Sequence, residues 1–392
     1  MRIGLVFPSI YASLHMFPDK IFAPRELCID LVNGLVRHGH EVTVYSVPDF
    51  QTEATLISEP IDTVSHPRVY HKFRHMQSVD RAKIEHEYAK HQFELRMFTR
   101  AFRDAQNGKY DVIHVYHDSS LFFSHYLQQF LPHMPVCYTL HDPLPPPDAY
   151  EYEEFTRHAN HNYVAISDSF RRSALQIHFV DTVYHGIDTT IYPYNDHPFE
   201  SFLFLGRLVK EKGLHTALAA SRITSDSLVV STNFPDEGEK NAYYDELMES
   251  LHLSQVHRIG VVSKPERIEL YRQAKALLFP IEWEEPFGIV LIEAMACGTP
   301  VIAFNRGSVP EIVKDGVTGF IIEPDDGHTR NHSGPLSVQK TGIDGIVEAM
   351  RRIREIDRKD CRQHVQEKFS IDHMVRGYER VYMSIRDSIF QQ

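Results

Sequence analysis

The stretch LLFPIEWEEPFGIVLIEAMACGTPVIAF (277–304) carries the residues best suited to chemistry. Glu285 and Glu293 lie eight positions apart on either side of a Pro-Phe-Gly turn. The flanking apolar residues predict a buried strand, an acidic loop, a helix and a second strand. A helix start offers unpaired backbone N–H groups, which suit phosphate and sugar oxygens. Glu285 can accept bonds from hydroxyls there, and Gly288 lets a ligand approach the backbone. The stretch predicts a site for a phosphorylated, polyhydroxylated ligand, although the spacing of the glutamates alone would also fit a capping or solvated pair.

A second loop, GRLVKEKG (206–213), places two cations between a predicted strand and a predicted helix. Arg207 and Lys212 at a helix start would complement a diphosphate. Taken alone, the loop could equally carry two solvent-exposed basic residues that bind no ligand. His141 directly follows another predicted strand, where it could bond a substrate hydroxyl or transfer a proton. With 25 histidines in the chain, a structural role is the default for any one of them, His114 and His117 included.

Several other enzyme signatures are absent from the sequence. No Asp-x-Asp pair occurs, which counts against a metal-bridged diphosphate, and no GxxxxGK[ST], GxSxG or GxGxxG motif occurs. The cysteines are too far apart for a zinc motif, which predicts reduced, mostly buried thiols. They are Cys28, Cys137, Cys297 and Cys361.

The composition is typical of a globular protein of about two domains. The chain has 392 residues, 42% hydrophobic and 24% charged, and a formal net charge of -12. The acidic balance counts against nucleic acid and anionic lipid as partners. No run approaches the roughly 18 apolar residues of a membrane span, and MRIGLVFPSI fits a first strand better than a signal peptide. We therefore expect a cytoplasmic protein with no integral membrane segment.

Alternating strands and helices are expected to position these motifs. A turn-rich segment at 186–198 separates two such series, which predicts two parallel sheets covered by helices. The polar stretch 325–342 is predicted to be a surface insertion. Predicted strands are 2–7, 41–47, 112–116, 136–140, 164–166, 181–184, 202–206 and 227–231, and predicted helices include 24–38, 80–106 and 371–389.

Segments throughout the chain resemble the retaining family-four glycosyltransferases of the GT-B fold. The most specific are EPFGIVLIEAMACGTPVIAF, GSVPEIVKDGVTGF and GRLVKEKG, and the others are RHGHEVTVYS, YTLHD, AISDSFR, HGID and FSIDHMVRGYERVY. The resemblance implies an α/β protein of two Rossmann-like domains with parallel sheets facing a central cleft. Residues 1–190 would form the acceptor domain and 191–374 the donor domain, with a helix at 375–392 packing back on the first.

The resemblance also implies transfer of a hexose from a UDP- or GDP-sugar, with retained anomeric configuration and neither metal nor cofactor. Arg207 and Lys212 would hold the diphosphate and stabilise charge on the leaving group. The donor sugar would contact Glu285 and the backbone of Phe287, Gly288 and Ile289.

Further roles follow from the same resemblance. Glu293 would bind the ribose hydroxyls, and the backbone near Val262 would bind the nucleotide base. His141 would contact the transferring sugar. The sequence departs from the family at Phe22-Ala23, where many members have Gly-Gly, and at Ser231-Thr232, where members often have Ala-Gly. Bulk at Phe22 is predicted to narrow the acceptor side.

Three functions remain open at this level. The first is a retaining glycosyltransferase with a small-molecule, glycan or lipid-linked acceptor. The second is another GT-B enzyme, such as a nucleotide-sugar epimerase or a phosphorylase. The third is a non-catalytic protein that binds sugar nucleotides, which the departure at Phe22-Ala23 favours. The sequence leaves the acceptor and the oligomeric state open.

Overall fold

The computed structural model describes residues 1–17, 22–60, 78–116, 121–174, 176–235, 241–325 and 337–390. The chain divides into two compact units. The N-terminal unit contains Met1–Ile166, Phe170–Gly186 and Ile371–Gln392, and the C-terminal unit contains Ser167–Ser169 and Ile187–Ser370. The main transition, between Gly186 and Ile187, lies inside the turn-rich segment. His117 and most of the predicted insertion lie outside the described residues.

The N-terminal unit is built on a seven-stranded parallel sheet in the order β3-β2-β1-β4-β5-β6-β7. Its inner strands are buried on both faces, as the continuous apolar runs require. The strands are β1 (Arg2–Val6), β2 (Glu41–Tyr45), β3 (Thr55–Ile57), β4 (Val112–Val115), β5 (Val136–Thr139), β6 (Asn162–Ala165) and β7 (Phe179–Thr182).

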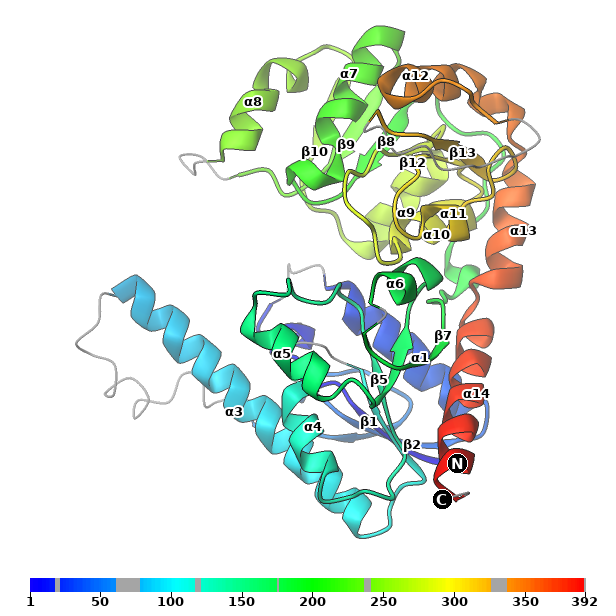
Figure 1. The fold of residues 1–392 in the computed structure, drawn as a ribbon. Coiled ribbons are helices and arrows are strands. Elements are labelled where there is room, and N and C mark those ends of the chain that lie inside the picture. The colour runs from blue at the N-terminus through cyan, green and yellow to red at the C-terminus, as the bar shows by residue number, and fades with distance from the viewer. Residues whose placement is uncertain are drawn as a thin grey trace. The chain divides into compact units, whose positions relative to one another are not determined.

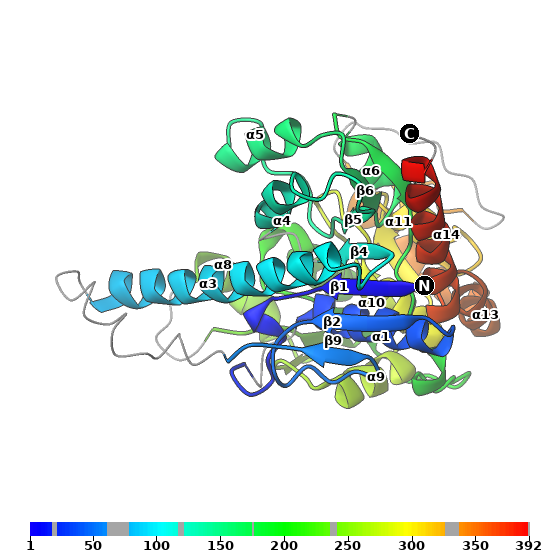
Figure 2. The same cartoon turned by 90° about the horizontal axis from the view of Figure 1, so that it is seen from below.

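Helices cover both faces of this sheet (Figure 1). The long helix α3 runs beside β1 (Figure 2) and buries Phe93, Met97 and Ala101, which recur every fourth residue. The helices are η1 (Ile10–Ala12), α1 (Ala23–Arg37), α3 (Ser78–Gln106), α4 (Leu121–Gln128), α5 (Tyr150–Arg157), α6 (Asp168–Ser173) and α14 (Ile371–Phe390).

The last helix, α14, packs on the N-terminal unit. Gly34 on α1 permits this contact, since a Cβ there would lie 2.6 Å from Val375 Cγ2. On the sheet side, His114 Nδ1 lies 2.7 Å from the Tyr382 hydroxyl and its Nε2 lies 2.8 Å from Thr139 Oγ1. His114 therefore joins the sheet to α14.

The C-terminal unit has a six-stranded parallel sheet in the order β10-β9-β8-β11-β12-β13. In Figure 1, α7 and α12 lie on one face and α9 and α10 on the other. The strands are β8 (Phe202–Leu205), β9 (Leu228–Ser231), β10 (Val256–Ile259), β11 (Leu277–Phe279), β12 (Val301–Phe304) and β13 (Gly319–Ile322). The helices are η3 (Thr189–Ile191), η4 (Lys210–Lys212), α7 (Leu214–Thr224), α8 (Ala242–Leu251), α9 (Lys264–Gln273), α10 (Ile289–Ala296), α11 (Val309–Ile312), α12 (Gly342–Arg352), η5 (Ile353–Glu355) and α13 (Arg358–Lys368).

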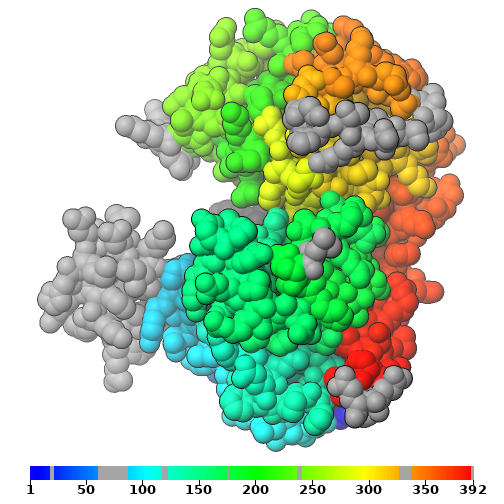
Figure 3. Space-filling view, in the orientation of Figure 1, coloured from blue at the N-terminus to red at the C-terminus, as the bar shows by residue number. Residues whose placement is uncertain are grey.

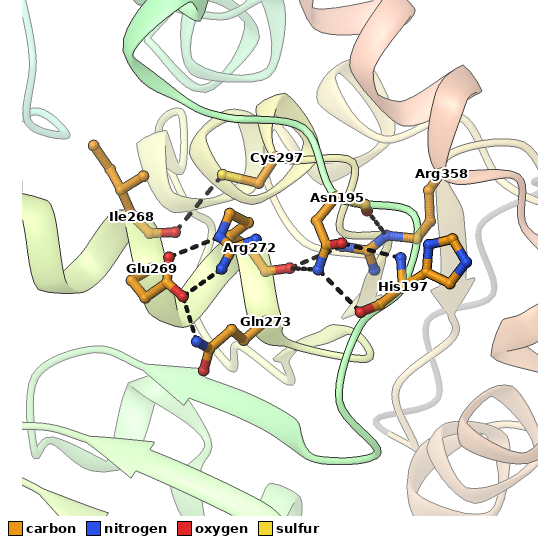
Figure 4. A network of polar contacts seen from close by, with 8 residues as sticks. All are labelled: Asn195, His197, Ile268, Glu269, Arg272, Gln273, Cys297 and Arg358. Atoms are coloured by element: carbon orange, nitrogen blue, oxygen red, sulfur yellow. Dashed lines mark hydrogen bonds and ion pairs between the residues drawn. The ribbon is translucent and has the colours of Figure 1, made fainter.

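A polar network fastens the end of this unit to its beginning (Figure 4). Arg358 on α13 donates from Nε to the Asn195 carbonyl oxygen at 2.6 Å, and Asn195 Nδ2 donates to the Arg272 carbonyl oxygen at 2.9 Å. Arg272 in turn donates to both carboxylate oxygens of Glu269. Cys297, in the same view, is one of four buried free thiols, so the expectation of reduced, buried cysteines is confirmed.

Both sheets reverse their strand order at one place, between β1 and β4 in the first unit and between β8 and β11 in the second. In such open parallel sheets, ligands bind beyond the carboxyl ends of the strands at this reversal. The predicted loops after β8 and β11 lie at that position, because Leu203 and Leu277 are paired neighbours. Among the described residues, no helix is both long enough and apolar enough to cross a bilayer.

Candidate functional site

The loop after β8 and the loop after β11 are joined to each other. Glu282 N donates to the Glu211 carbonyl oxygen at 2.8 Å, and His215 Nε2 lies 2.8 Å from Glu282 Oε1. Gly213 permits this approach, because a Cβ there would lie 1.8 Å from the Pro280 oxygen and its φ is +74°. The two predicted motifs therefore form one structure at the strand reversal.

Lys212 and Glu285 form an ion pair where these loops meet. Lys212 Nζ lies 2.8 Å from Glu285 Oε2, and Trp283 Nε1 donates to the same oxygen at 2.9 Å. The ammonium also lies 5.1 Å from the centre of the Trp283 ring, within cation–π range. The two charged side chains are 15% and 12% exposed. The pair is thus held in a defined position while solvent still reaches it.

The turn between Glu285 and α10 is supported from behind by the loop after β12. Ser308 N donates to the backbone carbonyl oxygen of Glu285 at 2.9 Å, and Ser308 Oγ donates to the backbone carbonyl oxygen of buried Phe287 at 2.7 Å. Gly288 caps α10 with a φ of +81°, a conformation that favours glycine. Ile289 is the first residue of α10, so its N–H belongs to the groups that have no acceptor within a helix.

Arg207 and Val262 lie in loops at the same end of the sheet. Arg207, two residues after β8, is exposed and makes no ion pair within the described part of the chain. Val262 is half-buried in the loop between β10 and α9. Arg207 is therefore a cation available to a ligand, whereas Lys212 already has a carboxylate partner.

Glu293 differs from Glu285 in its surroundings. Its side chain is 4% exposed, and Arg267 NH2 lies 3.1 Å from Oε1. The hydroxyls of Tyr192 and Tyr271 donate to Oε1 and Oε2 at 2.8 Å and 2.9 Å. Burial raises the pKa of Tyr271 well above its usual value, so this hydroxyl remains a donor. Glu293 therefore accepts from three groups of its own unit, and its expected bond to a ribose remains a prediction.

His141 and Phe22 belong to the N-terminal unit. His141, two residues after β5, stacks parallel to His185 with ring centres 5.4 Å apart and meets the Tyr116 ring edge-on at 4.4 Å. Burial lowers the pKa of His141 to about 3, so the ring is neutral at pH 7. Phe22 stands at the N-cap of α1, half-buried, with its ring stacked 6.2 Å from Phe7.

The structure brings together some predicted residues and adds others. Within the C-terminal unit, Lys212 and Glu285 are in contact, and Glu293 lies deeper. Sequence reasoning missed Trp283, although it is the chain's single tryptophan and lies two residues before Glu285. It also missed the partners of Glu293, because Tyr192 follows η3 while Arg267 and Tyr271 lie one turn apart on α9, far from Glu293 in the sequence.

Comparisons with known proteins cover both units. A model described as Glycosyltransferase Family 4 matches residues 26–191, and one described as Glycosyl transferases group 1 matches residues 195–330. The alpha-maltose-1-phosphate synthase of Mycolicibacterium smegmatis is 29% identical over 57% of this chain, which spans 62% of that relative's length. An uncharacterized glycosyltransferase of Methanocaldococcus jannaschii, MJ1607, is 25% identical over 93% of this chain and 95% of its own length.

Solved structures show the same fold at low identity. Alr3699/HepE of Anabaena, in complex with UDP and glucose, aligns with a TM-score of 0.67 at 16% identity, over 98% of this chain and all of its own. AviGT4, a glycosyltransferase involved in avilamycin A biosynthesis, aligns with a TM-score of 0.66 at 18% identity, over 99% of this chain and 98% of its own. The chain therefore belongs to the family-four type of glycosyltransferases with the GT-B fold.

Proposed function

We propose that the protein is a retaining glycosyltransferase that moves a hexose from a UDP- or GDP-sugar to an acceptor hydroxyl without a metal ion. The observation that carries the proposal is the Lys212–Glu285 pair, 2.8 Å apart at the strand reversal of the C-terminal unit. The cation suits the phosphates of a sugar diphosphate, and the carboxylate suits the hydroxyls of its sugar.

In this proposal the donor diphosphate binds Arg207, Lys212 and the start of α7. The exposed guanidinium of Arg207 supplies a charge that no described residue neutralises. Charge builds up on the leaving phosphate during transfer, and fixed cations stabilise that charge without reorganising. Two side-chain cations would thereby take the role that a divalent ion has in other transferases, which is why we expect no metal requirement.

The donor sugar would bind Glu285 and the turn into α10. Glu285 Oε2 already accepts from Lys212 and Trp283, whereas no bond from a described residue to Oε1 is found. Oε1 is then the oxygen that accepts from a sugar hydroxyl. The backbone N–H groups of Phe287, Gly288 and Ile289 would approach the same sugar, since Gly288 has no side chain to obstruct it.

His141 would contact the transferring sugar as a neutral ring. Because burial lowers its pKa to about 3, it would accept or donate a hydrogen bond and would not deliver a proton as an imidazolium. Deprotonation of the acceptor would then fall to the departing phosphate oxygen on the same face of the sugar, which is the route consistent with retention.

Titration calorimetry with UDP, GDP and ADP, in EDTA throughout, tests the donor site first. We begin with UDP because the structural relative from Anabaena was crystallised with UDP-glucose. Micromolar binding of one nucleotide, lost in Arg207→Ala and retained in Arg222→Ala, would support the proposal. Arg222 is a matched control because it is an exposed arginine near the other end of α7. Absence of binding by all three nucleotides, or binding of ADP alone, would contradict the proposal.

Product analysis then separates transfer from other chemistry. A transferase yields free nucleotide and a glycosylated acceptor with the donor's anomeric configuration. An epimerised donor in the absence of any acceptor would instead identify a nucleotide-sugar epimerase.

A further inference from the structure

Three histidines of the N-terminal unit meet at the amino end of its sheet. His125 lies on α4, His158 directly follows α5, and His161 directly precedes β6. Ring centres are 4.5 Å apart for His125 and His158, 4.8 Å for His125 and His161, and 5.0 Å for His158 and His161. His141 follows the carboxyl end of β5, which runs parallel to β6, so the three histidines lie at the opposite end of the sheet.

Each of these rings has a buried nitrogen without a hydrogen-bond partner among the described residues. These atoms are His125 Nδ1, His158 Nε2 and His161 Nδ1. A buried polar group that makes no hydrogen bond costs about 1–3 kcal/mol. A single unpaired nitrogen is weak evidence of a ligand. Three unpaired nitrogens from separate elements in one cluster indicate a shared ligand.

The surroundings orient the rings. The Tyr163 hydroxyl lies 3.2 Å from His125 Nε2, and it donates to the His158 carbonyl oxygen at 3.3 Å. This leaves Nδ1 of His125 as the coordinating atom, in the way that outer hydrogen bonds fix the tautomer of a metal ligand. The Tyr138 ring stacks on His161 with centres 5.4 Å apart.

One buried carboxylate lies close to the cluster. Glu154, 3% exposed, accepts from the Tyr126 hydroxyl at 2.9 Å and forms an ion pair with Arg157, so its charge is already balanced by a side chain of its own helix. The region from α4 to β6 forms much of the near face of this unit in Figure 3, and His161 is only half-buried.

We propose that His125, His158 and His161 bind one divalent transition-metal ion, with Zn²⁺ as the first candidate. One ring nitrogen from each residue lies within 4.8 Å of the others. Zinc binds imidazole nitrogen at about 2.0–2.1 Å, so the nitrogens of a tetrahedral site lie about 3.3–3.4 Å apart. Ring rotations that bring the nitrogens closer by roughly 1–1.5 Å would therefore complete the site. Three imidazoles favour zinc, copper or nickel over magnesium or calcium.

The ion would cross-link three elements. It would tie α4 and the end of α5 to the start of β6, at the end of the sheet that does not carry His141. Its role would therefore be to stabilise this end of the unit, separately from the metal-independent donor site proposed above. A water or another exogenous ligand would complete four-coordination.

Metal binding to the full-length chain, prepared without a histidine tag, tests the proposal. Protein stripped with EDTA is titrated with Zn²⁺ against a chromophoric zinc indicator, and with Co²⁺ while the visible spectrum is recorded. We expect one tight equivalent of Zn²⁺ and the intense ligand-field bands of four-coordinate Co²⁺. We also expect a higher melting temperature with Zn²⁺ than without it.

Single substitutions locate the site. His158→Gln and His161→Gln are each expected to lose the tight equivalent, because Gln keeps the polarity and approximate size but not the imidazole ligand. His133→Gln, an exposed histidine between α4 and β5, is the matched control and should bind as the unchanged protein does. Circular dichroism checks that the variants fold.

Two results would overturn the inference. One is full retention of the tight equivalent in His158→Gln and His161→Gln. The other does not depend on any variant's folding: no equimolar Zn²⁺ binding by the unchanged chain, or only the weak spectrum of six-coordinate Co²⁺. Nucleotide binding in EDTA is measured on the same preparation, so failure here is distinguishable from failure of the proposed donor site.

Discussion

The two units share one strand order but bury different polar groups. The N-terminal unit holds neutral imidazoles, among them the buried His114 and His185 and the half-buried His141. The C-terminal unit holds the ion pair of Lys212 with Glu285 at its strand reversal and buries the ion pair of Arg267 with Glu293. The common sheet places loops at equivalent positions, whereas the side chains around them decide whether a site is neutral or charged. A charged site suits a sugar diphosphate, which is why we propose the donor site in the C-terminal unit.

Acidification should destabilise the N-terminal unit more than the C-terminal unit, and this is the largest effect that we predict. An unfolded histidine takes up a proton below a pKa of about 6.5, whereas burial lowers the pKa of His114 and of His141 to about 3 in the folded chain and lowers that of His185 well below its usual value. Stability is therefore complete above pH 6.5 and falls as the pH approaches 3. Each ring lowers the free energy of unfolding by at most about 1.4 kcal/mol per pH unit of acidification. The three rings together lower it by at most roughly 4 kcal/mol per pH unit.

Hydrogen exchange, corrected for intrinsic rates, measures this effect unit by unit. Between pH 7 and pH 5, peptides from β4 and β5 should lose protection before peptides from β11 and β12. Equal loss in both units would show that the buried imidazoles do not distinguish them.

Glu293→Ala should destabilise the C-terminal unit by about 3–5 kcal/mol, because it leaves the buried Arg267 charge without its partner. Urea unfolding followed by tryptophan fluorescence reports this unit, since Trp283 is the only tryptophan of the chain. Glu246→Ala, on the exposed side of α8, is the control and should change stability by less than about 0.5 kcal/mol. A loss as small as that of the control would mean that Arg267 and Glu293 do not form a buried pair.

Glu285→Ala should change stability less than Glu293→Ala does, and it should reduce sugar transfer strongly. Its pair with Lys212 is partly exposed, so stability should change by no more than about 1 kcal/mol. Sugar transfer should fall by at least about 10²–10³-fold, the usual effect of removing a group that stabilises the transition state. Turnover from a panel of nucleotide sugars measures the loss, and unchanged turnover would count decisively against the assigned role.

Trp283→Phe should have the smallest effect. The substitution keeps an aromatic ring near Lys212 but removes the N–H that donates to Glu285 at 2.9 Å. One hydrogen bond to a charged group is worth about 1.5 kcal/mol or more, so we expect transfer to fall about tenfold. Trp283→Ala should cost more than Trp283→Phe if the ring also helps to hold Lys212, and identical losses would limit the role of Trp283 to its N–H.

Much of the fold could be predicted from local patterns. The strands at 112–115, 136–139 and 202–205 lie within one or two residues of their predicted positions, because apolar runs between turn residues are local signals. Strand β3 was not predicted, since three half-exposed residues at the sheet edge give almost no periodic signal. The loops after β8 and β11 were recognised from their charged residues and their glycines, and Gly213 and Gly288 adopt positive φ in the structure.

The sequence by itself determined which elements form and which loops carry charge, because periodicity, glycines and turn residues act over short stretches of chain. Only the tertiary structure decided how two glutamates of one motif differ: Glu285 stays partly exposed beside Lys212, while Arg267 and two tyrosines enclose Glu293. It likewise decided that His125, His158 and His161 converge. Burial and hydrogen bonding depend on groups brought together from distant parts of the chain, and no local pattern encodes them.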